Sequence, residues 1–427
     1  MLIGPAVRRV AIVGGSRIPF ARGMGAYAGL GNQELLTGAL QGVVTRFGLA
    51  GERLGEVAAG AVIKHSNQWN LARECVLGSG LHPSTPAFDL QRACGTSLEA
   101  AIQIANKIAL GQIDAGIAGG SDSVSDAPIV YPRDYQQLLL ASARGRTLGA
   151  RLKPWLGLRP SFFKPVAPAV IEPRTGLSMG QSCERMAQEW AISRADQDAL
   201  AAESHHRAAA AYAAGFYADL VVPFAGLDAD NLLRADTSIE KLAKLRPVFD
   251  QSAGGTLTAG NSTALTDGAA AVLLASEDWA RARDLPVLAT LSTAAVAAVD
   301  FVGSEGLLMA PAYAVPKLLA ARGLRLQDFD YYEIHEAFAA QVLCTLKAWE
   351  SETFCRERLG LPAALGPIDR TKLNVVGSSL ALGHPFAATG ARILATLAKL
   401  LAERGGRRGL VSVCTAGGMG VTAIVER

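Results

Sequence analysis

The sequence is poor in charged residues, which make up 19% of the chain, and it contains only six histidines. The formal net charge of +3 comes without a long basic run, which argues against a nucleic-acid-binding protein. No apolar run of about 18 residues is free of charges and turn formers, so no membrane span is expected. The first ten residues lack the pattern of a secretion signal or a transit peptide. These absences predict a reduced, cytoplasmic protein.

Cysteine is also scarce, and its spacing excludes two kinds of site. The six cysteines are Cys75, Cys94, Cys183, Cys344, Cys355 and Cys414. There is no Cys-x-x-Cys and no Cys/His ligand spacing, so a zinc site is not expected. A disulfide framework does not suit a chain of this size without a signal peptide. Glycine, in contrast, is abundant with 45 residues, and half of the chain is hydrophobic, which is typical of a compact globular protein.

Apolar runs typical of buried strands alternate with segments of helical periodicity. Strands are predicted at residues 10–13, 57–63, 86–90, 115–118, 286–295, 329–334, 409–413 and 420–425, and helices at residues 32–47, 69–78, 97–108, 181–190, 194–214, 311–322, 337–350 and 389–404. Residues 270–275 fit a buried helix or a buried strand. The alternation predicts an α/β fold with a mainly parallel sheet covered on both faces. Gly14-Gly15 follows the first strand as a turn, but the Gly-x-Gly-x-x-Gly spacing of a nucleotide-binding loop fails.

The pattern changes in the middle of the chain and then returns. Residues 131–170 mix Arg and Lys with leucines, aromatic residues and several prolines. This stretch is either an irregular insertion with solvated charges or a surface that contacts a membrane or a partner. The flanking regions look alike, because each has a strand, turn and helix with a reactive residue and then a strand ending in Ala-Gly-Gly. We therefore predict two duplicated halves, residues 1–123 plus 253–285 and residues 286–427, with a loop domain at residues 124–252.

Cys94 lies where a predicted strand gives way to a predicted helix. Gly95, Thr96 and Ser97 follow it and suit a tight turn and a helix start. A thiol at a helix N-terminus faces exposed N–H groups, which favour the thiolate. The alternative is that Cys94 is a small buried hydrophobic residue, as most free cysteines are.

Three further candidates lie in turns. His384 stands between Gly383 and Pro385 before the last helix, Cys414 ends a buried strand, and His335 follows another strand. Each alone has the alternative of a satisfied histidine or a buried thiol. Together with Cys94 they are predicted at the C-terminal ends of strands, the edge where open α/β sheets bind ligands. A Cys/His pair makes an activated nucleophile, and a second thiol can move a proton to or from carbon.

Seven stretches of the chain, in order and over essentially its whole length, resemble the thiolase family of acetyl-CoA C-acyltransferases. They are Cys94-Gly-Thr-Ser97, Ala118-Gly-Gly-Ser-Asp-Ser-Val-Ser125, Ser178-Met-Gly-Gln-Ser-Cys-Glu-Arg-Met-Ala187, Gly260-Asn-Ser-Thr-Ala-Leu-Thr-Asp-Gly-Ala269, His335-Glu-Ala-Phe338, Ala381-Leu-Gly-His-Pro-Phe-Ala-Ala-Thr-Gly390 and Cys414-Thr-Ala-Gly-Gly-Met-Gly420. The first and the last two are highly specific. The resemblance implies a five-layered αβαβα fold of two duplicated halves with an inserted loop domain.

The resemblance also implies roles for the candidates. Cys94 would be acylated, His384 would activate it, and Cys414 would be the acid and base. His384 and His335, the latter through a water, would form an oxyanion hole for a thioester enolate. The backbone N–H groups of Cys94 and Ala416 would form a second hole.

The same resemblance implies the ligands and the assembly. Coenzyme A would be a co-substrate, and Thr263 would contact the pantetheine of coenzyme A. Neither a cofactor nor a metal would be needed. The acyl-CoA enzyme would be a homodimer or a homotetramer.

Departures from the common family pattern point to a subtype. Many thiolases have Asn where this chain has His335, and His-Glu-Ala-Phe resembles the β subunit of fatty-acid oxidation trifunctional complexes. The basic and aromatic stretch before Thr175 resembles the membrane-facing loop of that subunit. Gly377-Ser-Ser replaces the usual Gly-Gly, and Ala416 replaces a common Gly. These features favour a degradative, longer-chain enzyme with a hydratase/dehydrogenase α-subunit as a partner and with peripheral membrane contact through the loop domain.

The predicted reaction is thiolytic cleavage of 3-ketoacyl-CoA to acetyl-CoA and a shortened acyl-CoA, as in fatty-acid β-oxidation. One alternative is the reverse, biosynthetic formation of acetoacetyl-CoA by an acetyl-CoA acetyltransferase. A decarboxylating ketoacyl synthase or a hydroxymethylglutaryl-CoA-type synthase lacks the second-cysteine loop at Cys414. A non-catalytic scaffold subunit is the third alternative, and the intact Cys94, His384 and Cys414 argue against it.

Overall fold

The computed structural model describes residues 7–166 and 170–427. Most of the N-terminal stretch that lacks a leader pattern, residues 1–6, lies outside the described residues, as do residues 167–169 of the basic and aromatic stretch. The chain divides into two compact units, residues 1–126 with 172–427 and residues 127–171. The second unit is smaller than the predicted loop domain of residues 124–252, whose boundaries stay a prediction.

The first unit carries the sheet and the helices that cover it. Its strands are β1 (Val10–Arg17), β2 (Ala21–Arg22), β3 (Glu56–Ala59), β4 (Ala87–Asp89), β5 (Ala115–Asp122), β6 (Thr266–Ser276), β7 (Ala289–Ala298), β8 (Tyr331–Ile334), β9 (Arg408–Thr415) and β10 (Met419–Glu426). Its helices are α1 (Asn32–Arg46), α2 (Leu71–Ser79), α3 (Thr96–Ala109), α6 (Met179–Glu189), α7 (Arg194–Ala213), α8 (Ile239–Ala243), α9 (Glu277–Arg281), α10 (Ala310–Arg322), α11 (Ala339–Glu350), α12 (Glu352–Glu357), α13 (Ser379–Leu382) and α14 (Thr389–Glu403), with 3₁₀ turns η3 (Arg370–Lys372) and η4 (Phe386–Ala388). No described helix has both the length and the hydropathy that a membrane span requires.

The predicted duplication is confirmed by the strand order. The first half has the order β4-β3-β5-β6-β1 and the second half β7-β10-β9-β8, joined where β1 pairs with β7. The orders match when β1, β3, β5 and β6 correspond to β7, β8, β9 and β10. Leu373, which forms a parallel bridge with Tyr332 of β8, then takes the place that β4 has beside β3.

The prediction of a mainly parallel sheet is wrong. Only the pairs β3–β4, β3–β5 and β8–β9 are parallel among the described strands, and the remaining pairs are antiparallel. A connection of three residues, 416–418, joins β9 to β10, and so short a link permits only antiparallel pairing. The two glycines after Val13 also form no turn, because β1 continues through them to Arg17 with a bulge.

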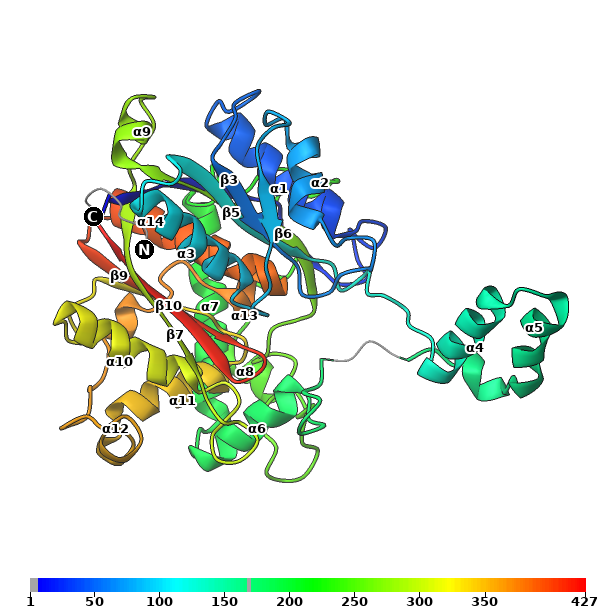
Figure 1. The fold of residues 1–427 in the computed structure, drawn as a ribbon. Helices are drawn as coiled ribbons and strands as arrows, with labels where there is room; N and C mark the ends of the chain where they lie inside the picture. The colour runs from blue at the N-terminus through cyan, green and yellow to red at the C-terminus, as the bar shows by residue number, and fades with distance from the viewer. Residues whose placement is uncertain (1–6, 167–169) are drawn as a thin grey trace. The chain divides into compact units, whose positions relative to one another are not determined.

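Strand β6 shows why the molecule is layered. Its side chains alternate between two hydrophobic cores: Val272 and Leu274 face one, and Leu273 and Ala275 face the other. Side chains on a strand point to opposite faces in turn, so a continuous apolar run is a strand covered on both sides. This settles residues 270–275 as strand. The outer core of the first half includes α1 and α2, that of the second half includes α10 and α11, and the central core includes α3 and α14, which gives the expected αβαβα layers (Figure 1).

The central helices α3 and α14 lie side by side (Figure 1). Gly390 in the first turn of α14 permits this approach, because a Cβ there would lie 2.3 Å from the backbone nitrogen of Leu98. The two helices occupy corresponding positions in the two halves. Their N-terminal ends therefore carry the segments of Cys94 and His384 to one place.

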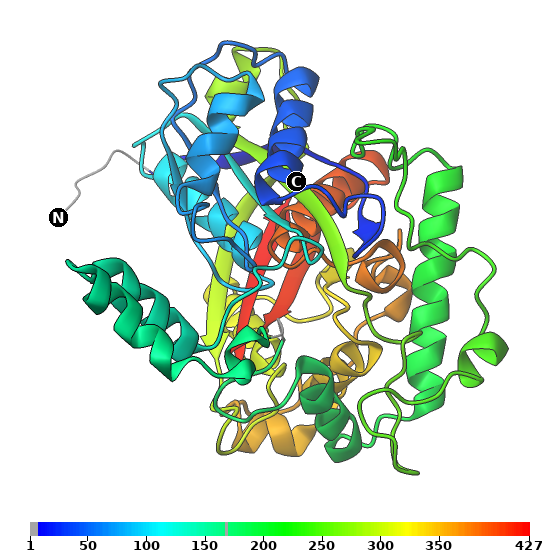
Figure 2. The ribbon, with the colours of Figure 1, turned by 90° about the vertical axis from the view of Figure 1, so that its right-hand side faces the viewer.

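The helices predicted after the basic stretch are both present. α6 begins at a capping box between Ser178 and Gln181, and α7 begins at Ser193, whose side chain accepts a hydrogen bond from the N–H of Asp196. α7 is the long bright-green helix of Figure 2. Both belong to the first unit, whereas the second unit contains α4 (Arg133–Arg144), α5 (Leu148–Leu152), η1 (Lys153–Gly157) and η2 (Pro160–Phe163).

Candidate active site

Cys94 lies in a tight turn between β4 and α3. Ala93 before it has a left-handed backbone with φ 43°, a conformation that costs a non-glycine residue roughly 1–3 kcal/mol. Thr96 stabilises the turn, because its Oγ1 accepts the N–H of Arg92 at 2.9 Å and donates to the carbonyl of Ala93 at 2.7 Å. The turn therefore fixes the direction of the Cys94 side chain.

The expectation that the helix start favours a Cys94 thiolate is wrong for the unliganded protein. The N–H groups of Gly95 and Thr96 already donate to the carbonyls of Arg92 and Ala93, so they are not directed at the sulfur. Burial raises the pKa of the Cys94 thiol to about 12, and the N–H groups of Ala416 and of Cys94 itself lower it by less. Cys94 is therefore a neutral thiol that needs a base, and the two N–H groups predicted for an oxyanion hole are the ones that contact its sulfur.

His384 lies between α13 and α14 and, contrary to the prediction, does not end a strand. Gly383 before it has φ 100°, which favours glycine. The N–H of His384 donates to Thr266 Oγ1 at 3.1 Å, and its Nδ1 forms a 2.6 Å hydrogen bond with Thr389 Oγ1. Its Nε2 is buried without a hydrogen-bond partner in the described residues. When Nδ1 carries the ring proton, Nε2 is the basic nitrogen.

His335 follows β8 directly, as predicted. Its N–H donates to the carbonyl of Ser412 in β9 at 2.8 Å, and its Nδ1 lies 2.8 Å from Ser379 Oγ. The ring centroids of His335 and His384 are 4.0 Å apart. Its Nε2, like that of His384, is buried and has no hydrogen-bond partner among the described residues.

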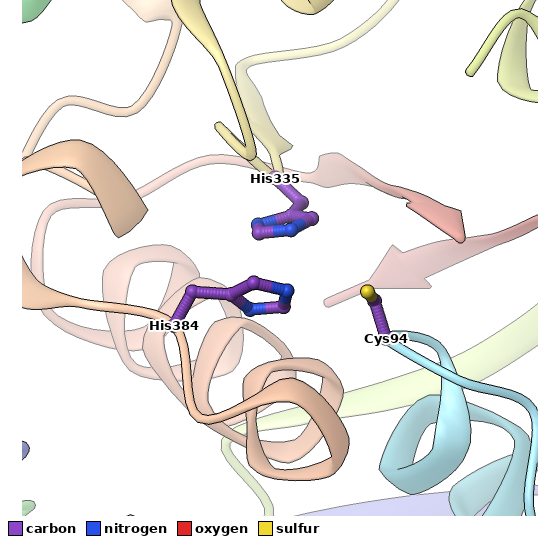
Figure 3. A group of neighbouring side chains, drawn as sticks. All are labelled: Cys94, His335 and His384. Atoms are coloured by element: carbon purple, nitrogen blue, oxygen red, sulfur yellow. The ribbon is translucent and has the colours of Figure 1, made fainter. Parts of the chain in front are cut away.

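The structure brings Cys94, His335 and His384 together. The sulfur and one nitrogen of each ring lie within 4.8 Å of one another, and the sulfur faces the rings (Figure 3). Burial lowers the pKa of His384 to about 3 and that of His335 well below its usual value, so both imidazoles are neutral at physiological pH. A neutral thiol beside a neutral imidazole can pass its proton to Nε2 when a substrate arrives. These three donors also suit a metal such as zinc by type, and the expectation of a metal-free enzyme stays a prediction.

Cys414 is the penultimate residue of β9 and is buried. Burial raises its pKa well above the usual value, and the nearby Cys94 raises it further. It therefore keeps its proton and is suited to donate it. The loop beyond β9 is held by Glu172, whose Oε1 accepts the N–H of Gly417 at 2.6 Å. This bond steadies the neighbouring amide of Ala416, which contacts the sulfur of Cys94.

Thr263 lies beside the segment that follows His335. Its N–H and its hydroxyl both donate to the carbonyl of Ala337, at 3.1 and 3.0 Å. The residue is half-buried. Its predicted contact with coenzyme A stays a prediction.

The sequence did not point to several side chains that position the site. Thr389 holds His384, Ser379 holds His335, and Asp122 links the two halves by accepting the N–H groups of Val62, Ile63 and Ala387 at 2.9, 2.7 and 2.7 Å. Asp122 lies in a quoted family stretch, but no local signal distinguishes its role. Burial raises the pKa of Asp122 to about 7.

Comparisons with known proteins agree with the motifs. The family models "Thiolase, N-terminal domain" and "Thiolase, C-terminal domain" match residues 10–278 and 285–427. The chain is 43% identical over 424 residues to the 3-ketoacyl-CoA thiolases of Pectobacterium carotovorum subsp. carotovorum and Yersinia pestis, over 98% of this chain and 96% and 97% of theirs.

Solved structures show the same likeness. A Bacillus anthracis acetyl-CoA acetyltransferase has a TM-score of 0.83 and 31% identity over 99% of both chains. Human mitochondrial 3-ketoacyl-CoA thiolase in complex with CoA has a TM-score of 0.80 and 29% identity over 98% of both chains.

Proposed function

The chain belongs to the thiolase family and is an acyltransferase, and from this premise we propose that it cleaves 3-ketoacyl-CoA with coenzyme A. The products are acetyl-CoA and an acyl-CoA two carbons shorter. The observation that supports this most directly is the cluster of Cys94, His384 and His335, with the protonated Cys414 nearby. The names of the bacterial relatives support the 3-ketoacyl-CoA substrate.

We assign the first half of the cycle to a nucleophile, a base and two oxyanion holes. His384 Nε2 takes the thiol proton while Cys94 Sγ forms a bond to the 3-keto carbon, and the N–H groups of Cys94 and Ala416 stabilise the oxyanion. The C2–C3 bond then breaks, and its electron pair moves into an acetyl-CoA enolate. His335 and His384 stabilise the enolate oxygen, and Cys414 donates a proton to the carbon.

The second half of the cycle transfers the acyl group. His384 returns to Cys414 the proton that it gained in the first half and then accepts the proton of the CoA thiol. The CoA sulfur attacks the acyl group on Cys94, and the expelled Cys94 thiolate takes the proton from His384. We propose that Thr263 contributes to the CoA site, because it lies against the segment of His335. The reaction as written needs no cofactor. The free cysteines in the described residues suit a reducing, cytoplasmic location.

Purified full-length enzyme should consume 3-ketoacyl-CoA only when CoA is added. The assay measures acetyl-CoA formation over a series of chain lengths, with malonyl-CoA as a second substrate. Cleavage of chains longer than four carbons is the expected result. Turnover of acetoacetyl-CoA alone would instead support the acetyltransferase named for the Bacillus anthracis structure. Release of CO₂ from malonyl-CoA would support a decarboxylating synthase, and inactivity throughout would support a scaffold subunit.

We further propose that the unit of residues 127–171 contacts anionic membranes. It contains seven Lys and Arg residues and a single Asp. Among its apolar side chains Leu156 is 90% exposed, Leu148 75% and Ile129 73%. Exposed leucines beside basic groups are the features of a segment that lies in a lipid interface. A homo-oligomer and a hydratase/dehydrogenase partner stay proposals, which rest on the resemblance of the chain to thiolases and of His335-Glu-Ala-Phe338 to the trifunctional-complex β subunit.

Replacing Leu148 and Leu156 with serine should weaken sedimentation of the enzyme with phosphatidylglycerol vesicles by about tenfold or more, because two exposed apolar anchors are lost. Binding should also weaken at high salt and be absent with phosphatidylcholine vesicles. The matched control replaces two exposed leucines of the other unit, Leu77 and Leu110, and should bind like the parent. Equal binding of both variants would contradict the proposal.

A further inference from the structure

Two departures from the common family pattern lie against each other in the structure. His335 replaces an Asn, and Ser379 belongs to the Gly377-Ser-Ser segment that replaces Gly-Gly. The side chains are 44 residues apart in the chain and 2.8 Å apart in space, joining His335 Nδ1 to Ser379 Oγ. Behind Ser379 lies Arg392 of α14, whose NH2 donates to Ser379 Oγ at 2.6 Å. All three side chains are buried.

We propose that Arg392 and Ser379 are positioning residues that hold His335 as the tautomer with its proton on Nε2, pointing at the enolate. This inference rests on the proposed thiolase function and assigns residues to one step of it.

The direction of the hydrogen bonds follows from the donors available. A guanidinium has only N–H donors, so Arg392 must donate to Ser379. The Ser379 hydroxyl has one proton, and His335 Nδ1 is the acceptor that the structure gives it. Because His335 is neutral and Nδ1 accepts a hydrogen bond, the single ring proton is on Nε2. That atom is buried with no partner among the described residues, and the centroid of its ring lies 4.0 Å from that of the tilted ring of His384.

The charge of Arg392 strengthens this arrangement. In the described residues Arg392 has no carboxylate within ion-pair distance. The nearby Glu333 is buried, which raises its pKa to about 8 and leaves it mainly protonated at neutral pH. The positive charge therefore polarises the Ser379 O–H toward His335.

The neighbouring histidine is held differently. Nδ1 of His384 bonds to Thr389, an uncharged hydroxyl that accepts as readily as it donates. His384 can therefore present a lone pair at Nε2 to the Cys94 thiol and later carry that proton. His335 instead is fixed as a donor. His384 is thus able to act as the base for Cys94, whereas His335 only donates to the enolate, so these two steps depend on different hydroxyl partners, Thr389 and Ser379.

The proposal predicts a selective defect when Ser379 is replaced by alanine. Thiolysis requires the enolate and should fall about 10- to 100-fold, less than the roughly 10²- to 10³-fold measured when a whole oxyanion donor is removed. Exchange of labelled CoA into acyl-CoA requires acylation of Cys94 but no enolate. This exchange should stay within about twofold of the parent. The two rates are measured on the same full-length preparation, and the Ser379→Thr variant, which retains the hydroxyl, should restore thiolysis.

Ser378→Ala is the matched control. It removes a neighbouring buried hydroxyl that accepts from NH1 of Arg392 at 3.0 Å but does not contact His335. Its ratio of thiolysis to exchange should equal that of the parent. Arg392→Gln, which keeps an N–H donor and removes the charge, should show the same selective loss as Ser379→Ala and provides the test if that variant does not fold.

Equal losses of thiolysis and exchange in the Ser379 and Arg392 variants would overturn the proposal, because that result indicates a structural role. So would unchanged thiolysis. A parent enzyme that performs neither reaction would instead overturn the thiolase function itself, which keeps the two failures distinct.

Discussion

Replacing Cys94 with alanine is expected to abolish both thiolysis and covalent labelling of the enzyme by acyl-CoA, with a rate loss of roughly 10⁴- to 10⁶-fold. The sulfur is the atom that bonds to the acyl carbon, and no other described cysteine has the same surroundings. Cys94 contacts the N–H groups of Ala416 and of itself and faces the two histidine rings. Without the thiol, the base and the oxyanion hole remain but have no nucleophile to assist.

Mass spectrometry of the intact protein after incubation with acyl-CoA measures this directly. The parent should gain one acyl group and the Cys94→Ala variant none. Cys75→Ala is a suitable control, since Cys75 is a free thiol that, like Cys94, has a raised pKa, but it lies in α2 away from the site. An acyl adduct on the Cys94→Ala protein would contradict both the nucleophile and the mechanism.

Much of the fold could be predicted because it depends on local patterns. The period of apolar residues located α1, α3, α7 and α14 to within one or two residues at each end. The direction of strand pairing could not be predicted, because it depends on which strands become neighbours. β6 illustrates the limit: its apolar run fits a buried helix equally well, and only the two cores on its faces decide between them.

The same limit applies to the candidate site, where residues marked by local patterns could be predicted and their distant partners could not. Cys94, His335, His384 and Cys414 could be found because glycines, prolines and family stretches mark their turns. Their partners could not be predicted, because Ser379, which contacts His335, lies 44 positions further along the chain, and Arg392, which contacts Ser379, lies 57 positions from His335. No local pattern predicts either contact. The prediction of a thiolate at Cys94 is wrong for a related reason. A helix start is a local feature, whereas burial, which dominates its pKa, comes from the tertiary structure.

Replacing Cys414 with serine should impair proton transfer to the enolate carbon and leave acyl transfer through Cys94 intact. A serine hydroxyl has nearly the same shape but is a far weaker acid than a thiol. Thiolysis should therefore fall about 10²- to 10⁴-fold, the usual contribution of a general acid or base. Exchange of labelled CoA through acyl-Cys94 needs no proton at carbon and should persist. The expected loss follows from the burial of Cys414, which keeps it protonated beside Cys94.

The exchange of the acetyl-CoA methyl protons with D₂O measures the step at carbon in isolation. The Cys414→Ser variant should lose this exchange, while Cys355→Ala, which removes another buried thiol in α12, should retain it. If Cys414→Ser still exchanges these protons at the parent rate, another group protonates the enolate. The observation that excludes a decarboxylating synthase, the role of Cys414, would then no longer hold. Cys94→Ala should lose acyl transfer and carbon chemistry together, whereas Cys414→Ser and Ser379→Ala should both spare acyl transfer. Restoration by Ser379→Thr then distinguishes the residue that orients the enolate donor from the one that supplies the proton.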